Sequence, residues 1–331
     1  MKLLRTGLIA VLLFAPLGGA FGQDKIRMGL SSVSGLHTAT WVAEERGFFR
    51  KYGLDVEVIV TGQGGIPGIG ALLANDIQLV SSAGDLLTSA ALRGGDTVML
   101  AGVVNKGLQR ILTVPEIKIP ADLKGKRVGV TRIGAVSYVV LQMMLQRWKM
   151  SVNDVQVMQV GSSPNMLVSL DKKGLEAAVL TIPSMFVAED RGYRVLIDMA
   201  DTDIYYLHTM VGSTRAYVKN NRDKVVRYLK GYLEGLAFAK QHKKESIDIV
   251  KKKLRISGPE QERNLERSID LLATKYYEAV PYPSLRGVET VLGYVEKDNP
   301  KAKTTDPKSL VDDSLLKEIE ASGFVKTLYA K

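Results

Sequence analysis

The chain has 331 residues, no cysteine and a formal net charge of +10. The lack of cysteine excludes disulfide bonds, thiolate metal sites and a cysteine nucleophile. Hydrophobic residues make up 46% of the chain and charged residues 24%, as in an ordinary globular protein, and the length allows two domains.

Residues 1–22 have the pattern of a secretory signal peptide. Lys2 and Arg5 precede an apolar stretch that Pro16 breaks, and small residues precede Gln23. The stretch is short and rich in glycine for a membrane span, although an uncleaved anchor is the alternative. We therefore expect a periplasmic protein. Because no cysteine can carry a lipid anchor, we expect the protein to diffuse freely. We also expect it to be a monomer. Outside the cytoplasm the positive charge does not predict a nucleic-acid partner.

Strand-like and helix-like segments alternate from Lys25 to about Met199. In the first part of the chain the apolar spacing predicts strands over 26–30, 56–60, 77–81 and 98–103, and helices over 36–52, 68–74 and 83–93. Gly53 follows the first helix, as a C-terminal glycine should.

The strand-like segments then recur with an offset of about 100 residues. Residues 26–30 align with 126–130, 55–58 with 154–157, 77–80 with 176–179, and 98–100 with 195–197. The repeat predicts two copies of one α/β unit. Two such lobes form a cleft between them, and a cleft is where a small ligand binds.

The pattern changes after Asp201. We expect a strand over 205–217 and helices over 222–240, 244–254, 261–279 and 284–297, none of which belongs to the repeat. These helices should return to cover the first lobe. The chain would then cross between the lobes near 106–110 and near 205–210. We expect lobe I to comprise residues 23–108 and 210–331, and lobe II residues 109–209.

Loops rich in hydroxyl groups follow the first strand of each unit, over 31–35 and 131–137. Free N–H groups at the start of the next helix attract anions, and in open α/β sheets ligands bind at these strand ends. Arg132 adds a guanidinium suited to a carboxylate, sulfonate or phosphate. The simpler interpretation is that the hydroxyl groups only cap helices.

No cofactor or metal is expected. The loop over 62–70 fails the dinucleotide fingerprint because Pro67 stands where a glycine is needed. The three histidines, His37, His208 and His242, lack metal-ligand spacing, and no hydrolase motif is present.

The segment 41–58, WVAEERGFFRKYGLDVEV, resembles the start of the periplasmic substrate-binding proteins of the NMT1/SsuA/TauA type. Residues 122–126 and 312–323 are similar too. The resemblance implies an α/β fold of the type II periplasmic-binding class, with two doubly wound lobes joined by two hinge crossings. It also implies a small ligand and an ABC-transporter membrane permease as partners.

The resemblance, together with the strand-end loops, gives a set of expected ligand-binding residues. They are Ser31, Ser34, His37, Gln63, Gly64, Ser81, Ser82, Thr131, Arg132, Gly134, Ser137, Ser162, Thr181, Pro183 and His208. The chain departs from many relatives at Ala135, where they have serine, and at Thr181-Ile182, where they have Trp-Glu. Sulfonate binding therefore does not follow from the resemblance.

We expect a receptor that captures a small anionic or zwitterionic ligand, such as a sulfonate, nitrate, taurine or an organic acid, and performs no chemistry. One alternative is a receptor for a heteroaromatic ligand such as a pyrimidine, stacked on Tyr138, Tyr205 or Tyr206. The other is a periplasmic enzyme on the same fold, for which His37 and His208 are the candidate acid–base residues.

Overall fold

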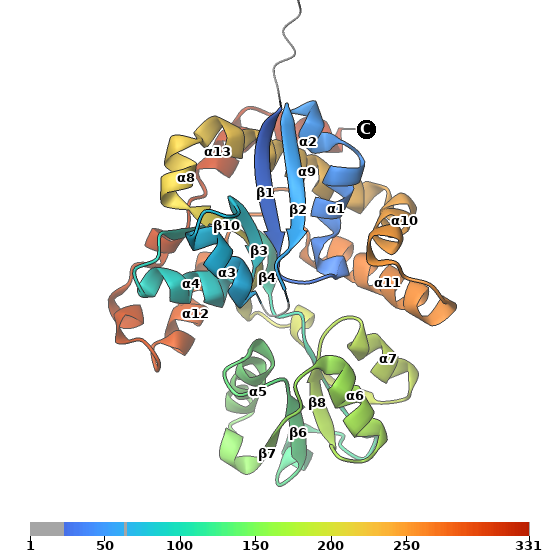
Figure 1. Cartoon of the computed structure of the whole chain (residues 1–331). Coiled ribbons are helices and arrows are strands. Elements are labelled where there is room, and N and C mark those ends of the chain that lie inside the picture. The colour runs from blue at the N-terminus through green and yellow to red at the C-terminus, as the bar shows by residue number, and fades with distance from the viewer. Residues whose placement is uncertain (1–22, 63–64, 331) are drawn as a thin grey trace, which may run out of the picture.

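The computed structural model describes residues 23–62 and 65–330, so the expected signal peptide, Gln63 and Gly64 lie outside the described residues. Within the described part, no helix combines the length and the apolar character that a membrane crossing requires. The chain forms two α/β lobes, one above the other in Figure 1. Lobe I and lobe II denote below the parts built on the first and the second sheet.

Two sheets of five strands have the same internal order, which confirms the predicted repeat. The first sheet runs β2 (Leu54–Val60), β1 (Asp24–Leu30), β3 (Leu79–Ser82), β10 (Tyr205–Thr214), β4 (Thr97–Lys106). The second runs β7 (Gln156–Gln159), β6 (Arg127–Val130), β8 (Ala177–Leu180), β5 (Arg110–Thr113), β9 (Arg194–Asp198). The aligned segments occupy equivalent strands, so the expected fold class is confirmed.

The fourth position in each sheet is filled by an antiparallel strand next to a chain crossing. β5 follows β4 directly and pairs with β8 and β9, and β10 returns to pair with β3 and β4. Tyr205 already pairs with Lys106, so the return crossing covers residues 199–204. The return crossing therefore lies just before the expected position near 205–210, where the expected strand begins.

The helices cover both faces of each sheet. Lobe I has α1 (Thr38–Glu45), α2 (Phe48–Lys51), α3 (Ile66–Leu73) and α4 (Gly84–Leu92), and lobe II has α5 (Val136–Arg147), α6 (Ser163–Asp171) and α7 (Ser184–Asp190). The C-terminal part supplies α8 (Arg215–Asn220), α9 (Arg222–Gln241), α10 (Lys243–Leu254), α11 (Pro259–Leu271), α12 (Leu285–Val295), α13 (Ser314–Ala321) and α14 (Phe324–Tyr329). As predicted, they return to lobe I, where α9 packs on α1 and β2, and α12 on α4 and β10.

The predicted helix over 36–52 is not continuous. A short 3₁₀ turn over Gly35–His37 leads into α1, which ends at Glu45, and α2 begins only at Phe48. Gly47 between them has φ +72°, a left-handed conformation that glycine adopts at no steric cost. The break turns α2 so that Phe49 is buried and stacks on Tyr228 of α9, with ring centroids 5.0 Å apart.

Helix α9 lies close to α1 and α2 because two glycines face them. A β-carbon on Gly235 would lie 2.3 Å from the carbonyl oxygen of Ala39, and one on Gly231 would lie 2.8 Å from the ring of Phe49. By contrast, Gly293 of α12 is exposed, and a β-carbon there would meet no atom within 4 Å.

We predict that Gly235→Ala and Gly293→Ala change stability in opposite directions. The added methyl group at Gly235 forces the two helices apart and should lower the free energy of unfolding by about 1–3 kcal/mol. At Gly293 the substitution only improves helix propensity and should raise the free energy of unfolding by about 0.5–1 kcal/mol. Urea denaturation measures both, and equal effects of the two substitutions would contradict the packing account.

His37 is buried at the point where the β1–α1 loop meets β3. Its side chain is 2% exposed, with Nδ1 3.1 Å from Ser81 Oγ and Nε2 3.4 Å from Ser32 Oγ. Burial, with a smaller contribution from the nearby His208, lowers the pKa of His37 to about 4. The imidazole is therefore neutral in the folded protein near pH 7, and it joins two strand ends through hydrogen bonds.

This lowered pKa predicts acid sensitivity. The unfolded chain binds a proton at His37 below about pH 6.5, whereas the folded chain binds it only below about pH 4. The contribution of neutral His37 to the free energy of unfolding is therefore intact above pH 6.5. As the pH falls toward 4, the free energy of unfolding decreases by on the order of 3 kcal/mol. Denaturation of the wild type and His37→Gln between pH 7 and pH 4 should show a shallower loss in the variant, and parallel curves would contradict the assignment.

Candidate functional site

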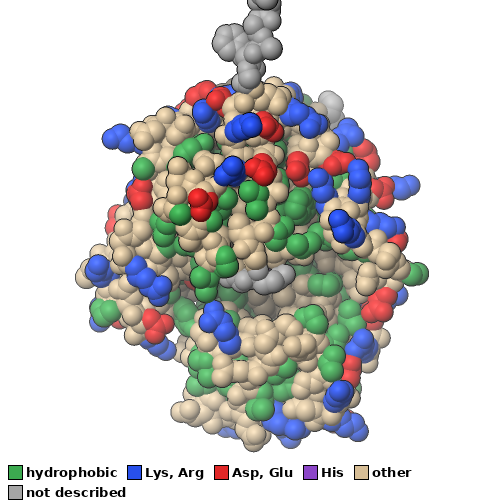
Figure 2. Space-filling view, in the orientation of Figure 1, with side chains coloured by type: hydrophobic (Ala, Val, Ile, Leu, Met, Phe, Trp, Pro, Cys, Tyr) green, Lys and Arg blue, Asp and Glu red, His purple; other side chains and the backbone are tan. Residues whose placement is uncertain are grey.

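A cleft of about 630 Å³ lies between the two lobes, and Figure 2 shows the molecule hollowed at this level. This interlobe cleft is lined by loops that follow β1, β3, β6, β7 and β8, so the carboxyl ends of strands from both sheets face it. Its lining residues are Ser31, Ser32, Leu36, Gly65, Ser82, Ala83, Asp85, Leu86, Gln109, Thr131, Arg132, Gly134, Ala135, Val136, Ser137, Gly161, Ser162, Ser163, Val179, Thr181, His208 and Thr209.

The wall from lobe I is held by hydrogen bonds between strand ends. The backbone N–H of Ser31 donates to the carbonyl of Ser81 at 3.1 Å, which ties the loop after β1 to the end of β3. A β-carbon on Gly65 would lie 2.6 Å from Ser82 Oγ, so the backbone at Gly65 lies too close to the Ser82 side chain for any residue larger than glycine. The Ser82 hydroxyl is buried and has no hydrogen-bond partner among the described residues.

The wall from lobe II is a polar loop at the start of α5. Ser137 Oγ accepts a hydrogen bond from the backbone N–H of Thr131 at 2.9 Å and lies 2.8 Å from Thr131 Oγ1. Gly134 has φ +84°, which lets the loop turn sharply between Arg132 and the helix. The two hydroxyl groups are thus engaged with each other, and Arg132 is the exposed charged group of this wall.

Nine of the expected residues line the cleft. They are Ser31, Ser82, Thr131, Arg132, Gly134, Ser137, Ser162, Thr181 and His208. Gln63 and Gly64 lie outside the described residues.

Four expected residues do not line the cleft. Ser34 caps the 3₁₀ turn through the N–H of Leu36, and Ser81 and His37 are buried against each other. Pro183 lines a separate pocket with residues of α7 and α11. Hydroxyl-rich sequence identified the right loops, but it could not show which side chains turn inward.

The cleft lining also contains Asp85, Gln109 and Thr209, which are not among the residues expected from the sequence. Asp85 lies in the first turn of α4, three residues beyond the end of β3, so its place after a strand was a usable signal. Gln109 belongs to the first crossing. Thr209, whose hydroxyl is 3.0 Å from His208 Nδ1, lies in β10 just after the return crossing.

Charges in the cleft come from Asp85 and Arg132. Burial raises the pKa of Asp85, while backbone N–H groups at the start of α4 and the positive charge of Arg132 oppose the rise. Burial also lowers the pKa of His208 to about 4, so His208 is neutral near pH 7 and offers hydrogen bonds rather than charge. Within the described residues no group of three or more acidic or histidine side chains could hold a metal ion.

Ion pairs join the lobes beside the cleft. Arg267 of α11 donates to Glu189 at 2.5 Å and to Asp190 at 2.9 Å, both in α7, and its guanidinium lies 4.3 Å from the centre of the Phe186 ring. Arg110 of β5 forms an ion pair with the other carboxylate oxygen of Glu189, at 2.6 Å. This arrangement fixes the spacing of the lobes along one edge.

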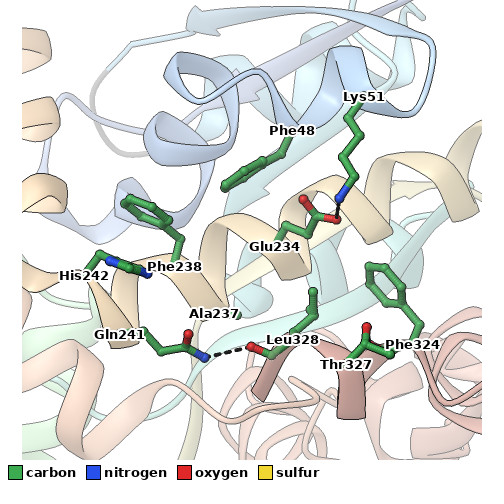
Figure 3. A pocket seen from close by; sticks show the side chains of 10 residues that line it. All are labelled: Phe48, Lys51, Glu234, Ala237, Phe238, Gln241, His242, Phe324, Thr327 and Leu328. Carbon is green, nitrogen blue, oxygen red and sulfur yellow. Dashed lines mark hydrogen bonds and ion pairs between the residues drawn. The ribbon is translucent and has the colours of Figure 1, made fainter. Parts of the chain in front are cut away.

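A second concavity, of about 360 Å³, lies on the outer side of lobe I between α2, α9 and α14 (Figure 3). Its buried carboxylate, Glu234, accepts hydrogen bonds from Lys51 at 2.6 Å and from Tyr52. Because that charge already has its partners, the interlobe cleft is the stronger candidate site.

Comparison with known proteins identifies the family. The family model described as NMT1/THI5 like matches residues 35–246. A Haemophilus influenzae protein assigned provisionally to thiamine biosynthesis is 29% identical over 153 residues, which cover 45% of this chain and 48% of that relative's length. A provisionally named binding protein of Brucella abortus is 26% identical over 66% of this chain and 67% of its own.

Solved structures share the fold. The periplasmic aliphatic sulphonate-binding protein SsuA of Escherichia coli aligns with a TM-score of 0.70 at 18% identity, covering 84% of this chain and 88% of its own. A mutant of DszB in complex with biphenyl-2-sulfinic acid aligns with a TM-score of 0.65 at 16% identity, covering 91% and 99%. The chain has the fold of periplasmic binding proteins, and it belongs to the NMT1/THI5-like family.

Proposed function

We propose that the chain is an exported solute-binding protein that captures a small anionic or zwitterionic ligand in the interlobe cleft and delivers it to an ABC-importer permease. The observation that carries this proposal is a cleft lined by strand ends of both sheets, with the exposed charge of Arg132 in its wall. The family, the fold and the binding proteins among the relatives support it. We further propose that the protein acts in the periplasm as a monomer, without a lipid anchor.

Closing of the lobes follows from this arrangement. A ligand that touches loops of both lobes favours the conformation in which both contacts form, so binding shifts the protein toward a closed state. The two crossings, over residues 107–109 and 199–204, restrict that motion to bending of the lobes about one edge.

The two alternative functions lose part of their support. Tyr206 is fully buried, and the Tyr205 ring already contacts the charged groups of Lys106 and Arg286, at 5.5 Å and 4.5 Å from its centre. Neither of these tyrosines lines the cleft, nor does Tyr138. Stacking of a heteroaromatic ring on them is therefore not supported.

The enzyme alternative required His37 and His208 as acid–base residues. His37 is buried outside the cleft lining, so only His208 of these two lines the cleft. We propose that the ligand leaves unchanged.

A thermal-shift screen tests the proposed function. The panel contains nitrate, ethanesulfonate, taurine, amino acids, aromatic acids and pyrimidines. A compound present at 100 times its dissociation constant should stabilise the protein by about 2.7 kcal/mol. A shift with pyrimidines alone would favour the heteroaromatic alternative, and conversion of a bound compound, followed by mass spectrometry, would favour the enzyme.

We predict that Arg132→Ala weakens binding of an acidic panel compound by roughly 10- to 100-fold, because a charge-assisted hydrogen bond contributes about 1.5–3 kcal/mol. Arg194→Ala is the matched control, since it removes an exposed guanidinium of lobe II that is not part of the cleft lining. Isothermal titration calorimetry measures both variants. Equal affinities of Arg132→Ala and the wild type would exclude Arg132 from the binding site.

A further inference from the structure

Asp85 places a carboxylate in the wall of the interlobe cleft that belongs to lobe I. It lies in the first turn of α4, after the buried strand β3. One of its oxygens, Oδ1, is buried and has no hydrogen-bond partner among the described residues. Burial of a polar atom without a partner is costly, so this oxygen is a site where a donor would be strongly held.

Some hydroxyl groups of lobe I are also buried without a hydrogen-bond partner among the described residues. The Ser82 hydroxyl, three residues earlier, is buried and unpartnered within the described part of the chain, and so is the Tyr206 hydroxyl, which is close enough to Asp85 for the two groups to influence each other's charge. Of these groups, Asp85 and Ser82 line the cleft, and the carboxyl oxygen, together with a hydroxyl oxygen that can accept as well as donate, is suited to a ligand nitrogen that carries hydrogen atoms.

Arg132 faces this wall from lobe II. Burial raises the pKa of Asp85, and the positive charge of Arg132 is near enough to offset part of that rise, yet the two side chains form no direct hydrogen bond or ion pair within the described residues. A guanidinium and a carboxyl group thus border one cleft of about 630 Å³ from opposite lobes without pairing with each other. A ligand with an acid group at one end and an amine at the other would satisfy both.

We propose that Asp85 is a specificity-determining residue that requires a protonated amine on the ligand, so that the cleft prefers small amino acids or amino sulfonates to simple anions. The inference rests on the proposed function, since it assumes that the interlobe cleft binds the solute. It narrows that function, because nitrate, plain sulfonates and plain carboxylates offer Asp85 no hydrogen-bond donor.

Matched pairs of compounds test this inference. Taurine and ethanesulfonate differ by one amino group, as do β-alanine and propionate, and calorimetry gives the affinity of each for the full-length mature protein. The wild type should bind the amine-bearing member of at least one pair about tenfold or more tightly. Asp85→Asn should reduce that ratio to near one, and Asp85→Ala provides a second variant if the first does not fold.

Controls separate the possible outcomes. Asp248→Asn removes an exposed carboxylate of α10 outside the cleft lining and should keep the wild-type ratio. Arg132→Ala should weaken both members of a pair. If the plain anions bind as tightly as the amines and depend on Arg132, the Asp85 inference is wrong while the proposed function stands. If none of the four compounds binds, the inference is overturned, and a shift with no compound of the wider panel would also overturn the proposed ligand class.

Discussion

The chain connects the two sheets through two antiparallel strands, each of which lies next to a crossing between the lobes. β5 enters the second sheet as soon as β4 leaves the first, and β10 returns to lie between β3 and β4. All five strands of the second sheet lie between Arg110 and Asp198, whereas the first sheet receives its interior strand β10 only after the chain has passed through lobe II. The same arrangement turns the carboxyl ends of the parallel strands toward one cleft, where loops and helix starts from both lobes meet.

The electrostatics of the cleft depend on which groups keep their charge. His208 is neutral near pH 7 because burial lowers its pKa, and the hydroxyl groups of Thr131 and Ser137 are engaged with each other. Arg132 supplies the positive charge of the cleft lining and Asp85 its acidic side chain, whose pKa burial raises. In the proposed function, the charged groups of the ligand contact one side chain on each lobe. Such contacts increase the affinity and favour the closed conformation.

Much of this architecture could be predicted from sequence, for identifiable reasons. The repeat at about 100 residues predicted two sheets of the same strand order, because the order of the apolar strand segments along the chain does not depend on the loops between them. The loops around Ser31 and Thr131 were found because hydroxyl residues follow strands there. The break at Gly47 and the position of the return crossing before Tyr205 could not be predicted, since both depend on tertiary packing rather than on local pattern, although the start of β10 at Tyr205 matches the expected strand. The direction of a side chain could not be predicted from sequence either. His37 and Ser81 were therefore expected in the cleft, although they are buried and form a hydrogen bond with each other.

The most direct test of the central claim is a crystal structure of the mature protein with its tightest-binding panel compound. We predict that the compound lies between the loop of Thr131 and Arg132 on one side and the start of α4 on the other, in contact with both lobes. A compound bound instead in the outer concavity beside Glu234, or to the surface of one lobe alone, would contradict it.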